Sequence, residues 1–172
     1  MVMLNELSTA RTLIRRFRLS DTDSFTGFMT NELITCNLAF DDSVKNEKGA
    51  IAILEQTVSA YDSEQPLMAY AIEYKANGAF IGACGMTILS PVEIEVFYAF
   101  IPGYWAKGLA TEVLSALTKL IRESYRFKKV HAFITQGNLA SKRVAEKNGY
   151  NDAGLVYKEG FRDQVSDYVL SL

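Results

Sequence analysis

The fold predicted for this sequence is decided by the stretch Glu93-Ile-Glu-Val-Phe-Tyr-Ala-Phe-Ile-Pro-Gly-Tyr-Trp-Ala-Lys-Gly-Leu-Ala-Thr111. Its first half alternates in polarity and is rich in aromatic and β-branched residues, which is typical of a strand. Pro102-Gly103 ends that strand, and a short loop with Lys107-Gly108 follows. From residue 109 to residue 125 the apolar residues recur at helical spacing, at Leu109, Val113, Leu114, Leu117, Leu120 and Ile121.

A strand that leads through a tight loop into a helix has a chemical consequence. The free backbone N–H groups of the first helical turn and the positive end of the helix dipole point at one place. Such a place binds anions, and phosphate groups are the anions most often found there. The stretch therefore predicts a phosphate-binding loop.

Composition limits the class of protein. The 172 residues are enough for one domain with a full core, and 49% of them are hydrophobic, which argues against disorder. The net charge of −2 provides no basic field for nucleic acid. An acidic chain favours a small cationic substrate, but only weakly.

Targeting and redox signals are also few. Cys36 and Cys84 form no Cys-x-x-Cys pair, so neither a disulfide framework nor a zinc site is expected. Glu6 and Arg11 lie where a signal peptide needs an apolar core, and no apolar run approaches the length of a membrane span. We predict a cytoplasmic protein that needs no metal and binds neither membrane nor nucleic acid. A homodimer is left open.

The remaining segments follow from local patterns. Strands are predicted over residues 13–17, 67–74, 80–89, 130–135, 156–158 and 165–170. Helices are predicted after an N-cap within residues 20–23, over residues 43–61 and over residues 138–148, where Asn138 is the N-cap and Gly149 the C′ residue. Asn77-Gly78 predicts a hairpin turn with positive φ at both residues. Residues 31–42 show no clear pattern.

This order of elements predicts an α/β fold. A run of strands beside crossover helices implies a mixed, strongly twisted sheet of six or seven strands. About four helices would cover both of its faces.

Several motifs together resemble the GNAT N-acetyltransferase superfamily. Tyr104-Trp-Ala-Lys-Gly-Leu-Ala-Thr-Glu112 is similar to its acetyl-CoA pyrophosphate loop, Arg/Gln-x-x-Gly-x-Gly/Ala, with Trp105 in place of the first residue. Asn138-Leu-Ala-Ser141 and Glu146-Lys-Asn-Gly-Tyr150 resemble motifs of the branch that holds ribosomal-protein N-terminal alanine/serine acetyltransferases and some polyamine and antibiotic acetyltransferases. Each motif alone is weak, but the ordered set covers nearly the whole chain. The resemblance implies one acyl-CoA N-acyltransferase domain over residues 1–172.

The resemblance also implies where acetyl-CoA would bind. Its pyrophosphate would lie on the loop and helix start formed by Ala106, Lys107, Gly108, Leu109, Ala110 and Thr111. Its pantetheine arm would run along Tyr98, Ala99 and Phe100, adding to the sheet edge as a peptide strand would. A side chain at residue 108 would collide with the pyrophosphate, although glycine also suits a helix start. Lys107 is either a solvated charge or a helper for phosphate.

The segment after residue 137 supplies a second group of candidates. Asn138 suits an N-cap, and the resemblance adds a hydrogen bond from its side chain to the pantetheine arm. Ser141 lies one helical turn further on. By resemblance it would protonate the leaving thiolate, whereas the alternative is that it only extends the cap. Many members of the family use a Tyr as this acid, seven residues after the Asn, but that position is Ala145 here.

Glu95 is the candidate general base. Strand alternation places Glu93, Glu95 and Phe97 on one face, opposite an apolar face that suits the core under the long helix. Glu95 also matches a Glu in the strand motif of the resembled branch, while a solvated charge is the equally weighted alternative. Family members carry a β-bulge in this strand, which would shift the alternation.

Together these features predict acetyl transfer from acetyl-CoA to a primary amine, either a protein N-terminus or a small amine. The amine would lose its proton to Glu95 and attack the thioester directly, and strand N–H groups near Tyr98 to Phe100 would hold the oxyanion. Two alternatives stay open. One is a transferase on the same fold for a longer acyl group or an antibiotic acceptor, and the other is a non-catalytic CoA-binding or interaction module.

Overall fold

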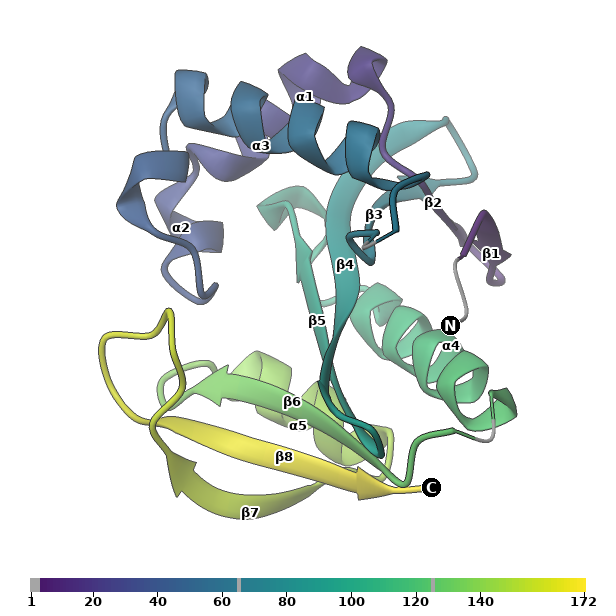
Figure 1. Ribbon diagram of the computed structural model, residues 1–172, viewed down its shortest axis with the longest axis vertical. Helices are drawn as coiled ribbons and strands as arrows, with labels where there is room; N and C mark the ends of the chain where they lie inside the picture. Colours follow the sequence, from purple (N-terminus) through teal and green to yellow (C-terminus); the bar gives the residue numbers. More distant parts are fainter. Residues whose placement is uncertain (1–3, 65, 125) are drawn as a thin grey trace.

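Eight strands form one mixed sheet in the order β1-β2-β3-β4-β5-β6-β8-β7 (Figure 1). The computed structural model describes residues 4–64, 66–124 and 126–172. In those ranges the strands are β1 (Glu6–Ser8), β2 (Thr12–Arg15), β3 (Ala69–Tyr74), β4 (Ala79–Ser90), β5 (Glu93–Phe100), β6 (Lys129–Thr135), β7 (Asn151–Val156) and β8 (Val165–Ser171). Neighbouring strands are antiparallel except β5 and β6, which are parallel.

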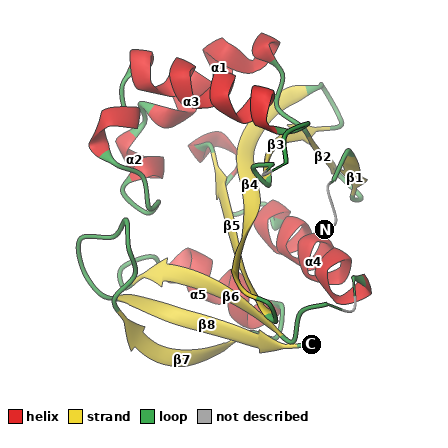
Figure 2. Ribbon diagram, in the orientation of Figure 1, coloured by secondary structure: helices red, strands yellow, loops and turns green. Residues whose placement is uncertain are grey.

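Five α-helices accompany this sheet in the described ranges: α1 (Thr22–Met29), α2 (Glu32–Thr35), α3 (Glu47–Ala60), α4 (Leu109–Glu123) and α5 (Leu139–Lys147). Short 3-10 turns are η1 (Leu19–Asp21), η2 (Asp42–Val44) and η3 (Pro102–Tyr104). Figure 2 shows α1, α2 and α3 grouped beyond one end of β4 and β5, while α4 runs beside these strands. The predicted α/β class with a mixed sheet is confirmed, with eight strands instead of six or seven. The three-residue β1 is too short to give a pattern.

Helix α4 is held by its apolar stripe. Val113, Leu114 and Leu117 are fully buried, and Leu109 at its first position is almost so. Burying one such side chain contributes about 1.5–3 kcal/mol. The helix start, and with it the loop that precedes it, is therefore fixed against the sheet. The predicted helix reached Tyr125, which lies outside the described residues.

Strand β5 has an apolar face and a mixed face, as predicted. Ile94 and Val96 are buried, whereas Glu95 and Phe97 are only partly so. The Phe97 ring covers Gly85 of β4 so closely that a Cβ there would lie 2.4 Å from the ring. Glu95 and Phe97 therefore share the face opposite α4.

The β-bulge implied by the resemblance is not found in the pairing of β5 with β4. That pairing runs without a register shift from Ile94 to Phe100. The shift lies at the other end of the strand, between Ile88 and Ser90 of β4. The facing of Glu95 therefore follows the simple alternation.

Strands β5 and β6 separate soon after they begin. Their pairing consists of Glu93 with Lys129, Ile94 with Val130 and Glu95 with His131. β6 stays paired with β8 along its whole length, and Figure 1 shows β5 and β6 running in different directions. From residue 96 to residue 100, the edge of β5 that faces β6 has no strand partner in the described chain. Apart from the Phe100 carbonyl, which accepts from Trp105 Nε1, its N–H and C=O groups are open to another molecule.

Two local predictions need correction. The hairpin between β3 and β4 is present, but Gly78 has positive φ and Asn77 does not. Four residues separate the two strands, and the Asn77 side chain accepts a hydrogen bond from the backbone N–H of Ala79 instead. The strand predicted over residues 156–158 is β7, which ends at Val156.

Among the described residues, no helix has the length and apolar character that crossing a membrane requires.

A buried ion pair joins the first helix to the sheet. Arg15 of β2 donates to both carboxylate oxygens of Asp21, at 2.8 and 2.9 Å, and to Glu73 of β3 at 2.8 Å. Burial by itself raises the pKa of Asp21, but the hydrogen bonds from Arg15 and the Arg18 backbone outweigh it and lower that pKa. The charged carboxylate therefore stabilises the fold.

We predict that Asp21→Asn lowers the free energy of unfolding by about 3 kcal/mol at pH 7, because it leaves a buried guanidinium short of its partner. The wild-type contribution of Asp21 should be present above about pH 4, the ordinary pKa, and vanish as the pH falls through the lowered folded-state pKa. Urea unfolding between pH 7 and pH 2 measures both effects. Asp62→Asn, at an exposed pair with Arg16, is the control and should change stability by less than about 1 kcal/mol. Equal effects of the two substitutions would contradict the role of Asp21.

Candidate active site

The gap between β5 and β6 opens into a cleft of about 970 Å³. Its walls come from β5, β6, the loop before α4, the start of α5 and the helices α1 to α3. A volume of this size is typical of ligand sites. The cleft is therefore the candidate active site.

One end of the cleft is formed by the loop before α4. Ala106 and Gly108 both have positive φ, at 57° and 75°. This conformation is unfavourable for a residue with a Cβ and easy for glycine. The turn brings Gly108 to the N-cap position of α4, so the first-turn N–H groups, which have no partner within the helix, face the cleft end. The cleft lining also contains the cations Lys107, Arg143, Lys147 and Lys158.

A second segment, the turn between β1 and β2, holds this loop in place, and no sequence pattern predicted that contact. Glu112, in the first turn of α4, accepts hydrogen bonds from the Arg11 backbone N–H at 2.7 Å, from Arg11 Nε at 2.9 Å and from the Thr9 hydroxyl. Arg11 Nη1 also donates to the Lys107 carbonyl at 2.9 Å. Burial by itself raises the pKa of Glu112, but these hydrogen bonds outweigh it and lower that pKa. The turn between β1 and β2 therefore holds the end of the loop at Lys107 and the first turn of α4 at Glu112.

Trp105 closes the loop onto the end of β5. Its indole Nε1 donates to the Phe100 carbonyl at 2.6 Å, and its side chain remains partly exposed. Lys107 lies with its ammonium 5.0 Å from the centre of the Tyr104 ring. The indole contact anchors Trp105 between the loop and β5. The Lys107 ammonium lies on the cleft lining, where it can approach an anion.

Asn138 and Ser141 stand on the opposite wall. The Asn138 side chain accepts from the Ser141 backbone N–H at 3.1 Å, which confirms it as the N-cap of α5. Gly149 follows the C-cap with a positive φ of 82°, as predicted for the C′ residue. The Tyr98 hydroxyl donates to the Ser141 carbonyl at 3.2 Å. Burial raises the pKa of Tyr98 well above its ordinary range, so this hydroxyl remains neutral and ties β5 to α5.

Glu95 has a partner that the sequence did not reveal. Lys158, in the loop between β7 and β8, places its Nζ 2.7 Å from Glu95 Oε2. The same ammonium lies 4.6 Å from the centre of the Phe133 ring. Both charged side chains are largely buried. Lys158 lies 63 residues from Glu95 in the sequence, so no local spacing connects them.

The cleft brings the predicted site residues together. Its lining contains Glu95, Tyr98, Ala99, Phe100, Ala106, Lys107, Gly108, Leu109, Ala110, Thr111, Asn138 and Ser141. Glu93 is not part of the lining and pairs with Lys129 at 3.5 Å. The residues missed by sequence reasoning are Arg11, Arg143, Lys147 and Lys158.

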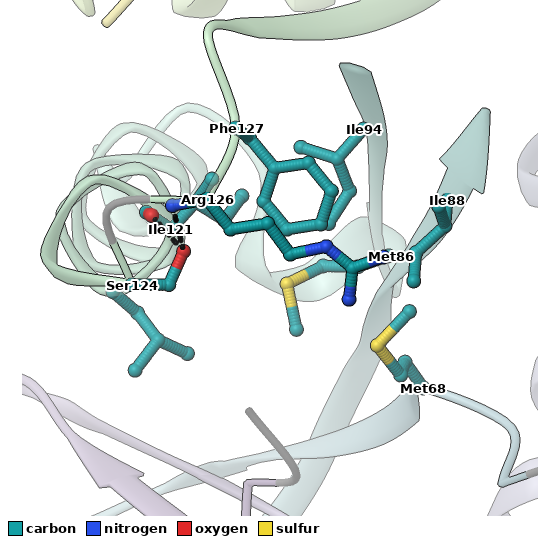
Figure 3. A pocket seen from close by; sticks show the side chains of 9 residues that line it. Met68, Met86, Ile88, Ile94, Ile121, Ser124, Arg126 and Phe127 are labelled. Atoms are coloured by element: carbon teal, nitrogen blue, oxygen red, sulfur yellow. Dashed lines mark hydrogen bonds between the residues drawn. The ribbon is translucent and has the colours of Figure 1, made fainter. Parts of the chain in front are cut away.

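A second, smaller cavity lies between the end of α4 and the strands β4 and β5. Figure 3 shows the side chains that surround it, among them Met68, Met86, Ile94, Arg126 and Phe127. Its volume is about 90 Å³, well below that of ordinary ligand sites. We treat it as a packing defect of the core.

Comparison with known proteins decides the family. The sequence profile of the acetyltransferase (GNAT) domain matches residues 11–151. The chain belongs to the GNAT acetyltransferase family. Among curated proteins, this GNAT chain is 25% identical over 152 residues to the uncharacterized N-acetyltransferase YoaA of Bacillus subtilis (strain 168), covering 87% of the chain and 85% of that relative.

Solved structures agree on the GNAT fold. An acetyltransferase of the GNAT family from Bacillus anthracis superposes with a TM-score of 0.77 at 18% identity, covering 95% of both chains. RimL, a ribosomal L7/L12 alpha-N-protein acetyltransferase solved with coenzyme A, superposes with a TM-score of 0.79 at 15% identity, covering 97% of this chain and 98% of that one. Both likenesses show that this chain has the GNAT fold.

Proposed function

We propose that this protein transfers an acetyl group from acetyl-CoA to a primary amine by direct attack through a tetrahedral intermediate. The observation that carries the proposal is the separation of β5 from β6 directly beside the N-terminus of α4. This places an unpaired strand edge and an anion-binding helix start in one cleft. Acetyl-CoA carries a peptide-like arm, which suits the strand edge, and a pyrophosphate, which suits the helix start.

The proposed seat of acetyl-CoA follows from this match. The pyrophosphate would accept hydrogen bonds from the loop and first helical turn over residues 106–111, with Lys107, Arg143 and Lys147 near enough along the cleft to add positive charge. The amides of the pantetheine arm would pair with β5 over residues 98–100 as an added strand. The side-chain oxygen Oδ1 of Asn138 already caps α5. The side-chain N–H₂ group of Asn138 therefore remains to donate to that arm. The solved complex of RimL with coenzyme A supports a CoA ligand for a chain of this fold.

The proposed reaction needs a base and an oxyanion site. An alkylammonium has no lone pair, so the acceptor must first lose a proton. We assign Glu95 as the base that takes this proton, directly or through water. Lys158 donates to Glu95 Oε2, so Oε1 is the oxygen that would accept the proton. The amine nitrogen then bonds to the thioester carbon, and N–H groups of the free β5 edge hold the oxyanion. Collapse breaks the C–S bond and releases the CoA thiolate, which Ser141 or solvent protonates, while the nitrogen gives up its second proton to solvent and becomes the amide.

The second candidate is a CoA-binding module without catalysis. Two observations favour it: Glu95 is already paired with Lys158, and Ala145 stands where many family members have a Tyr acid. A thiolate is a good leaving group because its conjugate acid has a pKa of about 8.5, so the missing acid alone does not exclude turnover. Release of CoA thiol over a panel of amines separates an enzyme from a binder.

The proposed acetyl-CoA binding site predicts a thermal shift when CoA is added. Saturating CoA should stabilise the protein by about 2.7 kcal/mol at a hundredfold excess over Kd, with or without EDTA. Gly108→Glu should abolish this shift, since it adds bulk and negative charge at the pyrophosphate position. Gly103→Glu, which adds the same side chain in open space nearby, is the matched control. A folded Gly108→Glu protein whose melting temperature still rises with CoA would contradict the proposed binding site.

The proposed base predicts a kinetic effect. Glu95→Gln keeps the side-chain shape and should lower kcat by about 10²–10⁴-fold with little change in CoA affinity. Higher pH should rescue part of the loss, because more of the amine arrives deprotonated. Glu93→Gln, on the same strand face but outside the cleft, is the control and should act mildly. Near-normal kcat for Glu95→Gln would place the base elsewhere, whereas a raised KM for the amine at normal kcat would make Glu95 a substrate anchor.

A further inference from the structure

The end of the cleft away from the phosphate loop is lined by apolar side chains. They come from α2 and the residues after it, from the approach to β3, from β5 and from the β7–β8 loop: Leu33, Leu38, Phe40, Leu67, Phe97 and Phe161. Leu33 and Leu67 are 63% and 40% exposed although they line a cleft. Large apolar side chains left open to water inside a concave site are typical of a surface that a ligand covers.

Charge in the cleft is distributed unevenly. Among the described residues of the lining, Glu95 is the sole acid, whereas the bases are Lys107, Arg143, Lys147 and Lys158. The one carboxylate is already paired with an ammonium. A polycationic acceptor would bring further positive charges into this cleft without a carboxylate to meet them, and burying an unpaired charge is strongly unfavourable.

The apolar end is also bridged on one side. The Thr135 hydroxyl of β6 donates to Asn37 Oδ1 at 2.5 Å. Gly160, in the β7–β8 loop, lies so close to the segment after α2 that a Cβ there would be 2.8 Å from Ala39 Cβ. Figure 1 shows this loop reaching toward the segment that follows α2. These contacts join the two walls of the cleft on this side, an arrangement that favours a slender acceptor over a broad one.

We infer that the acceptor is a primary amine with one positive charge, carried on a slender apolar or aromatic body. This inference rests on the proposed acetyl transfer and specifies its second substrate. The amine would approach Glu95 and the thioester while its body lies against Leu33, Phe97 and Phe161. Polyamines and aminoglycosides are the acceptors that this arrangement disfavours.

A pair of amines with the same number of heavy atoms tests the inference. 1-Aminoheptane and 1,6-diaminohexane differ in one terminal group, a methyl in the first and a second ammonium in the second. With acetyl-CoA saturating, kcat/KM should be at least about tenfold higher for 1-aminoheptane. 2-Phenylethylamine should likewise exceed spermidine and kanamycin. Two tetrapeptides that differ only at the N-terminal residue extend the test to protein chain ends. The peptide with N-terminal Phe should have a higher kcat/KM than the one with N-terminal Ser. Comparing kcat/KM for the peptides with that for the small amines shows whether the acceptor is a small amine or a chain end.

A cleft variant makes the test specific to the site. Leu33→Glu adds an acid at the apolar end and should reduce the preference for 1-aminoheptane by about tenfold or more, with the KM for acetyl-CoA unchanged. Leu155→Glu adds the same charge at a comparably exposed leucine of β7, outside the cleft, and should change neither value. Identical behaviour of the two variants would overturn the assignment of this end to the acceptor.

The outcomes separate this inference from the proposed function. Faster turnover of 1,6-diaminohexane, spermidine or kanamycin than of the monoamines, or a preference for the Ser peptide, overturns the acceptor class and leaves acetyl transfer standing. A protein that shifts with CoA but acetylates none of these amines overturns the proposed transfer, and the acceptor class falls with it.

Discussion

The structure depends on one interrupted pairing, that of β5 with β6. The two parallel strands share three residue pairs and then separate, while each stays paired with its own antiparallel neighbour, β5 with β4 and β6 with β8. An unpaired strand edge inside a protein is unfavourable unless water or a ligand satisfies its N–H and C=O groups. The gap is thus both a weakness of the sheet and the origin of the cleft.

The contacts around the gap hold its two walls in fixed positions. Arg11 and Glu112 hold the loop before α4 to the β1–β2 turn, and Trp105 ties that loop to the end of β5. On the other wall, Asn138 caps α5, and the Tyr98 hydroxyl joins that helix back to β5. These contacts orient the helix start before any ligand arrives, which lowers the ordering free energy that binding must overcome.

The sequence predicted what local chemistry controls. Alternation in residues 93–100, the helical period after Leu109 and the capping residues Asn138 and Gly149 were enough for the α/β class, the strand–loop–helix order at β5 and α4 and the facing of Glu95. It did not predict what distant pairing controls: the ion pair of Glu95 with Lys158, the clamp of Arg11 on Glu112, and α2, whose four residues carry no period. The predicted two-residue turn at Asn77-Gly78 was wrong, because the loop between β3 and β4 has four residues.

Amide hydrogen exchange along β5, with and without saturating CoA, tests the central claim most directly. In the free protein, the N–H groups of residues 96–100 that do not face β4 should exchange quickly, because no strand covers that edge. With CoA bound, their exchange should slow by about tenfold or more, together with that of the first turn of α4. Slower exchange at α4 with unchanged exchange along β5 would show that the ligand does not add to this strand, and would contradict the account.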